Sequence, residues 1–106
     1  MMRRPPSVDA MLDDLWLDLD ALCRAAGVAP DWVQRRADEG LLPLAPQGAH
    51  DAWRFDAAQL RRVRCMVRIE RDFDAVPELA ALVADLEAEI QRLRRRLHAL
   101  GADFGP

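Results

Sequence analysis

The sequence contains no lysine and no tyrosine, and it has few of the residues that carry chemistry in enzymes. Its two histidines, His50 and His98, and its one serine, Ser7, are far apart in the chain, and it has no glycine-rich phosphate loop. The two cysteines, Cys23 and Cys65, are 42 positions apart and have no histidine at ligand spacing. We therefore expect a non-enzymatic protein without a metal site, cofactor or disulfide, in which the cysteines are small buried apolar residues.

Long apolar runs are also missing. The basic start of the chain is followed by five aspartates within residues 9–20, which interrupt any stretch of signal-peptide length. No run approaches the roughly 20 apolar residues that span a bilayer. With 106 residues the chain has room for one domain and an appended helix. These features predict a cytoplasmic protein without a membrane segment.

The charge is unevenly distributed along the chain. All 15 positive charges are arginine, the net charge is −3 and the isoelectric point is near 5.3, which argues mildly against a dedicated DNA-binding domain. Residues 54–71 nevertheless carry six arginines and two carboxylates, whereas residues 9–20 carry five aspartates and no base. A basic and an acidic surface on one molecule suit a protein partner as well as they suit DNA.

Two short helices are predicted near the start of the domain. The first covers residues 19–26, with Asp18 as N-cap and Gly27 as the C-terminal stop. The second begins at Pro30, a residue suited to the first turn of a helix, and ends at Gly40. Two helices of this length joined by a three-residue turn are typical of a helix-turn-helix, in which the second helix is the one that can enter a DNA groove.

A short β wing is expected after the second helix. Residues 41–44 leave the second helix in an extended form, residues 45–52 form a surface loop, and residues 53–55 form a short strand; before the first helix, residues 15–17 could form another short strand. Asp56 then caps a third helix over about residues 57–72, whose buried side is expected to include Leu60, Val63, Met66, Val67 and Phe73. Its other side presents a basic stripe of Arg61, Arg64, Arg68 and Arg71, which could follow phosphates or be a solvated face.

The last predicted helix covers residues 77–100 and carries Leu86, Ile90, Leu93, Leu97 and Leu100 at alternating spacings of four and three. This seam could pack back onto the rest of the chain or form a two-chain coiled coil. We favour a homodimer through residues 79–100, because the other elements are too few to cover a helix of about 35 Å. The expected organisation is a flexible lead-in (1–14), a winged helix-turn-helix (15–76), a partner-binding helix (77–100) and a tail (101–106).

The predicted core consists of the apolar residues that share the inner faces of these elements. They are Leu19, Leu22, Trp32, Val33, Leu41, Trp53, Phe55, Leu60, Val63 and Val67.

With these elements in order, the chain resembles the MerR-like helix-turn-helix proteins. The resemblance lies in residues 19–28, in Gly40-Leu41-Leu42-Pro43 and in Trp53-Arg54-Phe55-Asp56. It implies a mainly α fold, a MerR-like winged helix-turn-helix with a short β wing and a long C-terminal coiled-coil helix. The chain differs where DNA binding resides, since Gln34-Arg35-Arg36 replaces an Arg-Tyr-Tyr run and Trp53 replaces the wing tyrosine. These differences favour a protein partner.

A closer resemblance is to the chaperone modulator CbpM family, through residues 53–56, Arg68-Ile69-Glu70-Arg71-Asp72 and residues 86–93. It implies an inhibitor that binds the J-domain of a DnaJ-like co-chaperone of the CbpA type and blocks its work with DnaK and its DNA binding. A J-domain presents a basic helix, so we expect carboxylates at the contact: Glu78, Asp85 and Glu89, or alternatively Asp38 and Glu39 or the Asp-rich segment 9–20. The stripe on the last helix could equally serve only solubility and the helix dipole.

Two other functions are also consistent with the sequence. A DNA-binding transcriptional regulator would use Arg35, Arg36, Arg54 and Arg61 on phosphates. A structural dimerisation module would have no fixed partner.

Overall fold

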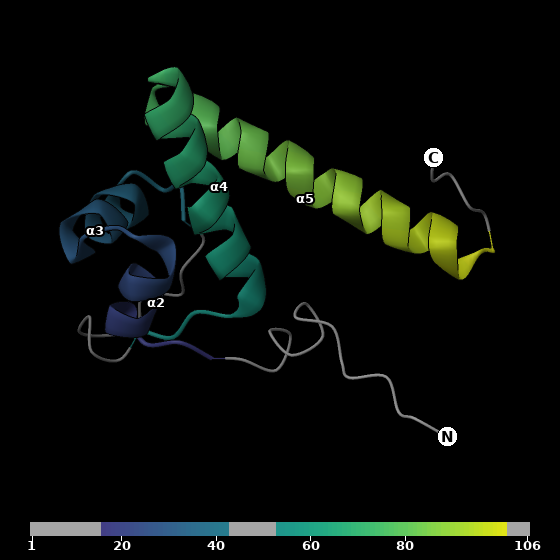
Figure 1. The fold of residues 1–106 in the computed structure, drawn as a ribbon, viewed down its shortest axis with the longest axis horizontal. Helices are drawn as coiled ribbons and strands as arrows, with labels where there is room; N and C mark the ends of the chain where they lie inside the picture. The colour runs from purple at the N-terminus through teal and green to yellow at the C-terminus, as the bar shows by residue number, and fades with distance from the viewer. Residues whose placement is uncertain (1–15, 43–52, 102–106) are drawn as a thin grey trace.

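A computed structural model of the chain describes residues 16–42 and 53–101. These residues contain four helices: α2 (Leu19–Ala26), α3 (Pro30–Asp38), α4 (Ala57–Phe73) and α5 (Pro77–Ala99). Figure 1 shows the short helices α2 and α3 beside α4, while α5 starts at the C-terminal end of α4 and projects away from it as a long arm. The predicted mainly helical architecture is therefore confirmed. The predicted lead-in (1–14), the loop (45–52) and nearly all of the tail (101–106) lie outside the described residues.

The ends of the helices follow local capping chemistry. Asp18 accepts a hydrogen bond from the backbone N–H of Ala21 at 2.8 Å and begins α2, and Gly27 ends that helix in the left-handed conformation at φ 72°. Asp56 and Gln59 form a reciprocal capping box at the start of α4, with both hydrogen bonds at 2.8 Å. The predicted caps Asp18, Gly27 and Asp56 are thus confirmed.

The predicted β wing is not formed in the described part of the chain. Leu17 and Phe55 make a single antiparallel bridge, in which each N–H donates to the other residue's carbonyl at 2.8 Å. Each of the two residues is followed at once by a helix cap, Asp18 or Asp56. In an antiparallel bridge the residue after Leu17 lies opposite the residue before Phe55, and each segment turns into a helix one residue after the bridge. The pairing therefore does not extend at either end, and among residues 53–55 only Phe55 is paired.

The core lies where α2, α3 and the first part of α5 meet α4. Seven of the ten predicted core residues are buried: Leu22, Val33, Trp53, Phe55, Leu60, Val63 and Val67. Leu19, Trp32 and Leu41 are half-buried and pack against this cluster. Cys23 and Cys65 are buried free thiols, as expected, and burial is the largest cause of the raised pKa of each.

Phe73 was expected on the buried side of α4, but 71% of it is exposed. It lies on the same face as Met66, but α4 ends at Phe73, and Asp74 turns the chain at φ 49° into the segment that leads to α5. The helical periodicity correctly places Phe73 on the same face as the buried residues of α4. However, the part of α4 that packs against other elements ends before Phe73.

Helix α5 contacts the core only through its first two turns. Ala80, Ala81 and Ala84 are at most 4% exposed, and their small side chains let the axes of α4 and α5 approach closely. From residue 85 to residue 100 every residue of the arm is exposed. Within residues 16–42 and 53–101, the leucine seam therefore does not pack back onto the rest of the chain.

Candidate partner-binding surfaces

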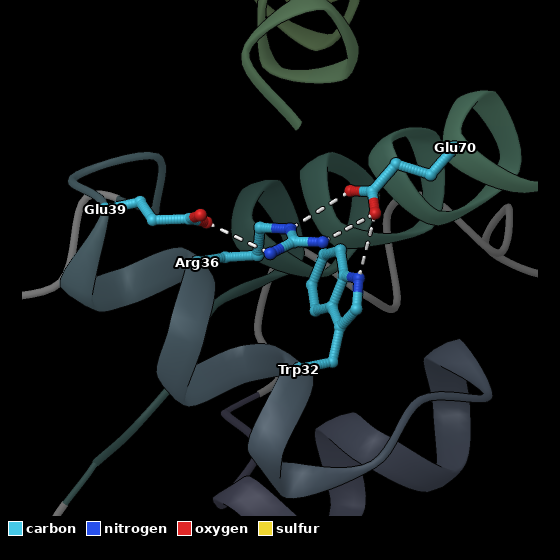
Figure 2. Close-up of polar contacts among 4 residues, drawn as sticks. All are labelled: Trp32, Arg36, Glu39 and Glu70. Carbon is cyan, nitrogen blue, oxygen red and sulfur yellow. Dashed lines mark hydrogen bonds and ion pairs between the residues drawn. The ribbon is translucent and has the colours of Figure 1, made fainter. Parts of the chain in front are cut away.

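The most elaborate polar cluster joins α3 to α4 (Figure 2). The guanidinium of Arg36 makes two hydrogen bonds to the Glu70 carboxylate, Nη2 to Oε1 at 2.7 Å and Nε to Oε2 at 3.1 Å, and a third to Glu39 Oε1 at 3.0 Å. The indole N–H of Trp32 donates to Glu70 Oε1 at 3.3 Å, and the guanidinium lies 4.9 Å from the centre of the Trp32 ring. The hydrogen bonds to Glu70 are the largest cause of the raised pKa of Arg36.

This cluster holds the Arg36 guanidinium inside the molecule. Only 8% of Arg36 is exposed, and its guanidinium is hydrogen-bonded to Glu70 and Glu39. The DNA-binding hypothesis assigned Arg36 to phosphates, and its ion pair with Glu70 was not predicted from the sequence. A signal was present, since Glu70 is the only carboxylate among the first fifteen residues of α4, which carry five arginines.

The basic stripe on α4 is also largely engaged within the chain. Arg64 donates to the carbonyl of Ala25 through Nε and Nη2 at 3.3 and 3.2 Å, and Arg71 donates to the carbonyl of Gly27 at 2.7 Å. These carbonyls belong to the C-terminal end of α2, where a cation complements the helix dipole. Arg68 forms an ion pair with Glu87 of α5 at 2.6 Å. The stripe thus ties both α2 and α5 to α4.

The candidate carboxylates fall into two separate groups. Glu78, Asp85 and Glu89 share one exposed face of α5, at spacings of seven and four residues. Asp85 forms an ion pair with Arg62, and Arg92 forms one with Glu89, whose pKa is lowered by that hydrogen bond. Asp38 and Glu39 lie instead at the end of α3, and two residues beyond Glu39 the carbonyl of Leu41 accepts a hydrogen bond at 2.9 Å from Arg62, the arginine that pairs with Asp85.

The other arginines of the DNA-binding reading are exposed, but they come from different elements. Arg35 is on α3, Arg54 precedes α4 and donates to the carbonyl of Trp53 at 2.7 Å, and Arg61 is on α4. Of these three arginines, only Arg35 lies on α3, the helix that would enter a DNA groove.

The family follows from comparison with known proteins. A family model described as MerR HTH family regulatory protein matches residues 17–101. The chain belongs to this family. The chaperone modulatory protein CbpM of Pseudomonas entomophila (strain L48) is 30% identical over 79 residues, which cover 74% of this chain and 76% of that protein. The chain is therefore a CbpM-like member of the MerR family, and no solved structure matches it.

The exposed surface of α3 is acidic. With Arg36 buried, the exposed charged residues of α3 and its C-cap are Asp31, Asp38 and Glu39 against the single base Arg35. A helix that follows phosphates needs an excess of bases, because phosphate pairing supplies most of the affinity for DNA. The second helix of this helix-turn-helix carries the opposite charge.

The described residues contain neither a candidate metal site nor a candidate membrane-spanning helix. No group of three or more His, Cys, Asp or Glu side chains within residues 16–42 and 53–101 is placed to hold a metal ion. None of the four helices is both long enough and apolar enough to cross a membrane.

Proposed function

We propose that this CbpM-like chain is a chaperone modulator that binds the J-domain of a DnaJ-like co-chaperone and inhibits its stimulation of DnaK and its binding to DNA. The observation that carries the proposal is the acidic exposed surface of α3, three carboxylates against Arg35, with Arg36 held inside by Glu70. Such a surface repels a phosphate backbone and attracts a basic helix. The similarity to a chaperone modulatory protein supports the same partner class.

Two acidic surfaces can make this contact. The face of α5 with Glu78 and Glu89 is long and straight, which suits a basic helix lying alongside it. The pair Asp38 and Glu39 lies at the end of α3 and suits a smaller contact. Since the two groups belong to different helices, substitutions in one leave the carboxylates of the other unchanged and can show which one binds.

The direct test is calorimetric titration of the purified chain with a J-domain at 0.15 M salt. We expect a dissociation constant in the micromolar range or tighter, and the absence of binding at micromolar concentration overturns the proposal. Three double variants each remove two charges: Glu78→Gln with Glu89→Gln, Asp38→Asn with Glu39→Gln, and the control Asp20→Asn with Asp72→Asn. The variant of the contact surface should bind about tenfold more weakly, about 1.4 kcal/mol, and the control should bind like the wild type.

A DNA-binding regulator is the second candidate, and the match to a family of helix-turn-helix regulatory proteins favours it. It predicts binding to a palindromic duplex that weakens steeply with salt, and a salt slope that falls by about one when Arg35 or Arg61 is replaced by Gln. The same calorimeter and buffer therefore separate the two candidates.

In either case we propose that the chain acts as a homodimer through α5. Leu79, Leu86, Leu93 and Leu100 recur at seven-residue intervals, and each is between 44% and 79% exposed. The first half of α5 is acidic and the second half is basic. An antiparallel pair aligns these opposite charges, whereas a parallel pair aligns like charges, so we favour the antiparallel arrangement.

A further inference from the structure

A groove of about 780 Å³ lies between the first half of α4 and the exposed arm of α5. Two buried residues, Cys65 and Ala84, line its inner part. The lining also includes one carboxylate, Glu87, and six arginines: Arg61, Arg62, Arg64, Arg68, Arg94 and Arg95. The groove therefore has a small apolar floor, which is surrounded by positively charged side chains.

Internal pairing neutralises only part of this positive charge. Arg62 pairs with Asp85, and Arg68 pairs with Glu87. Arg64 is bonded to the neutral carbonyl of Ala25, so its charge remains. Arg94 and Arg95 are exposed on the arm. An occupant that fits this groove has carboxylates on one side and apolar side chains on the other, the helix-in-groove mode of recognition.

Residues 8–16 have a sequence of this kind. In residues 8–16 the apolar residues recur at alternating spacings of three and one, a sequence spacing typical of one helical face: Val8, Met11, Leu12, Leu15 and Trp16. The same segment carries Asp9, Asp13 and Asp14, and no base occurs between Arg4 and Arg24.

The described chain begins next to the groove. Leu17 is held to Phe55 by two backbone hydrogen bonds of 2.8 Å, and Phe55 is only three residues before Ala58, which lines the groove. Trp16, the first described residue, is 66% exposed at this point. Residues 8–16 therefore attach to the molecule within a short distance of the groove.

We propose that residues 8–16 dock into the groove between α4 and α5 of the same chain, with their apolar face toward Cys65 and Ala84 and their aspartates toward Arg94 and Arg95. The proposal rests on charge complementarity, on apolar spacing and on the place where the segment joins the fold. It does not depend on the identity of the external partner. A consequence is that the segment shields a basic surface whenever it is docked.

Paramagnetic relaxation in the full chain tests the docking. A spin label is attached at Ser7→Cys in a chain that also carries Cys23→Ala and Cys65→Ala, with the fold checked by the amide spectrum. We expect broadening of amide signals around Ala58 and around residues 91–95, and its loss at 0.5 M salt, where charge pairs are screened. Unchanged signals at these positions in low salt overturn the proposal.

Charge variants show whether the named arginines hold the segment. Arg94→Asp with Arg95→Asp should abolish the broadening, and adding Asp13→Arg with Asp14→Arg should restore it. The control, Arg92→Asp with Arg96→Asp, makes the same charge change on the same helix outside the groove and should leave the broadening in place. If the control Arg92→Asp with Arg96→Asp loses the broadening as fully as Arg94→Asp with Arg95→Asp, a contact at the groove is contradicted.

A mixed sample identifies the source of the segment. Spin-labelled chains without ¹⁵N are combined with ¹⁵N chains without the label, and we expect no broadening around Ala58, which lines the groove from α4 and is not part of the proposed α5 dimer interface. Broadening around Ala58 in this sample shows that a second copy supplies the segment and overturns docking within one chain. Hydrogen exchange of residues 58–65 gives a readout that keeps both cysteines: Asp9→Asn, Asp13→Asn and Asp14→Asn together should speed it, and unchanged exchange overturns the docking.

Discussion

Arg36 of α3 and Glu70 of α4 form a two-pronged ion pair across 34 positions of the chain, with N–O distances of 2.7 and 3.1 Å. The pair is nearly buried, with 10% of the Arg36 side chain and 15% of the Glu70 side chain exposed. It fixes the orientation of α3 relative to α4 and removes a base from the surface of α3. One contact thus contributes both to the fold and to the charge that the helix-turn-helix presents.

Replacing Glu70 by Gln should lower the free energy of unfolding by about 3 kcal/mol, because Arg36 then remains buried without its main counter-charge. The value lies at the low end of the range for a broken buried pair, since Glu39 is still in reach. Urea unfolding followed by circular dichroism measures this change. Glu87→Gln is the control, because its pair with Arg68 is about half exposed and should contribute less than about 1 kcal/mol.

The double variant Arg36→Met with Glu70→Met should recover most of the loss seen in Glu70→Gln. Removing both charges abolishes the desolvation cost together with the attraction. If the double variant is less stable than the single one, the pair stabilises the fold by more than its desolvation costs, and the stated reason is wrong.

Replacing Trp53 by Ala should destabilise the chain by about 3–5 kcal/mol, the usual cost of truncating a buried aromatic side chain. Trp53 is 7% exposed and packs edge-on against Phe55, with ring centres 6.2 Å apart and planes at 77°. Phe73→Ala removes an aromatic ring that is 71% exposed and should change stability by less than about 0.5 kcal/mol. Thermal melts of the two variants compare them directly, and equal melting temperatures contradict the assigned core.

Replacing Leu86 and Leu93 by Asp should convert the proposed dimer to a monomer without unfolding the rest of the chain. Both leucines are exposed in the single chain, so the core between α2, α3 and α4 does not use them. Analytical ultracentrifugation measures the mass, and circular dichroism checks the helices. Arg96→Glu changes charge on another face of α5 and should leave the mass unchanged; a wild-type chain that sediments as a monomer contradicts the proposed dimer.

Stability should fall as the pH rises above about 8.5, and the two cysteines should cause the fall. Burial raises the pKa of both Cys23 and Cys65, so the unfolded chain loses thiol protons at a pH where the folded chain keeps them. The free energy of unfolding therefore decreases with pH in this range and is unaffected below it. The absence of lysine and tyrosine leaves no other side chain with an ordinary pKa between 8 and 10.

The measurement is urea unfolding at pH 7.5, 8.5 and 9.5 under reducing conditions. Cys23→Ala with Cys65→Ala should give a flat profile, whereas Arg24→Gln, an exposed change on α2, should keep the wild-type slope. A slope that persists in the cysteine-free chain contradicts the assignment to the thiols.

The sequence predicts those features that depend on neighbours along the chain. Asp18, Gly27 and Asp56 indicate helix ends because a cap acts within three or four residues, and the core follows from the apolar periodicity of each helix. The bond between Arg36 and Glu70 escaped prediction because it joins residues on two helices whose relative rotation only packing decides. The strand at residues 53–55 is reduced to one bridge, and Phe73 is exposed, for a related reason: composition and periodicity do not report where pairing or packing stops.

The alanine contact between α4 and α5 makes the rest of α5 a lever. Ala80, Ala81 and Ala84 form the fulcrum, and the fifteen residues from Asp85 to Ala99 extend about 22 Å beyond it. A rotation of ten degrees at the fulcrum moves the tip of the arm by about 4 Å, while the core residues beneath it stay in place. The arm can also change length by whole heptads without disturbing the core, so its reach is set independently of the fold that carries it.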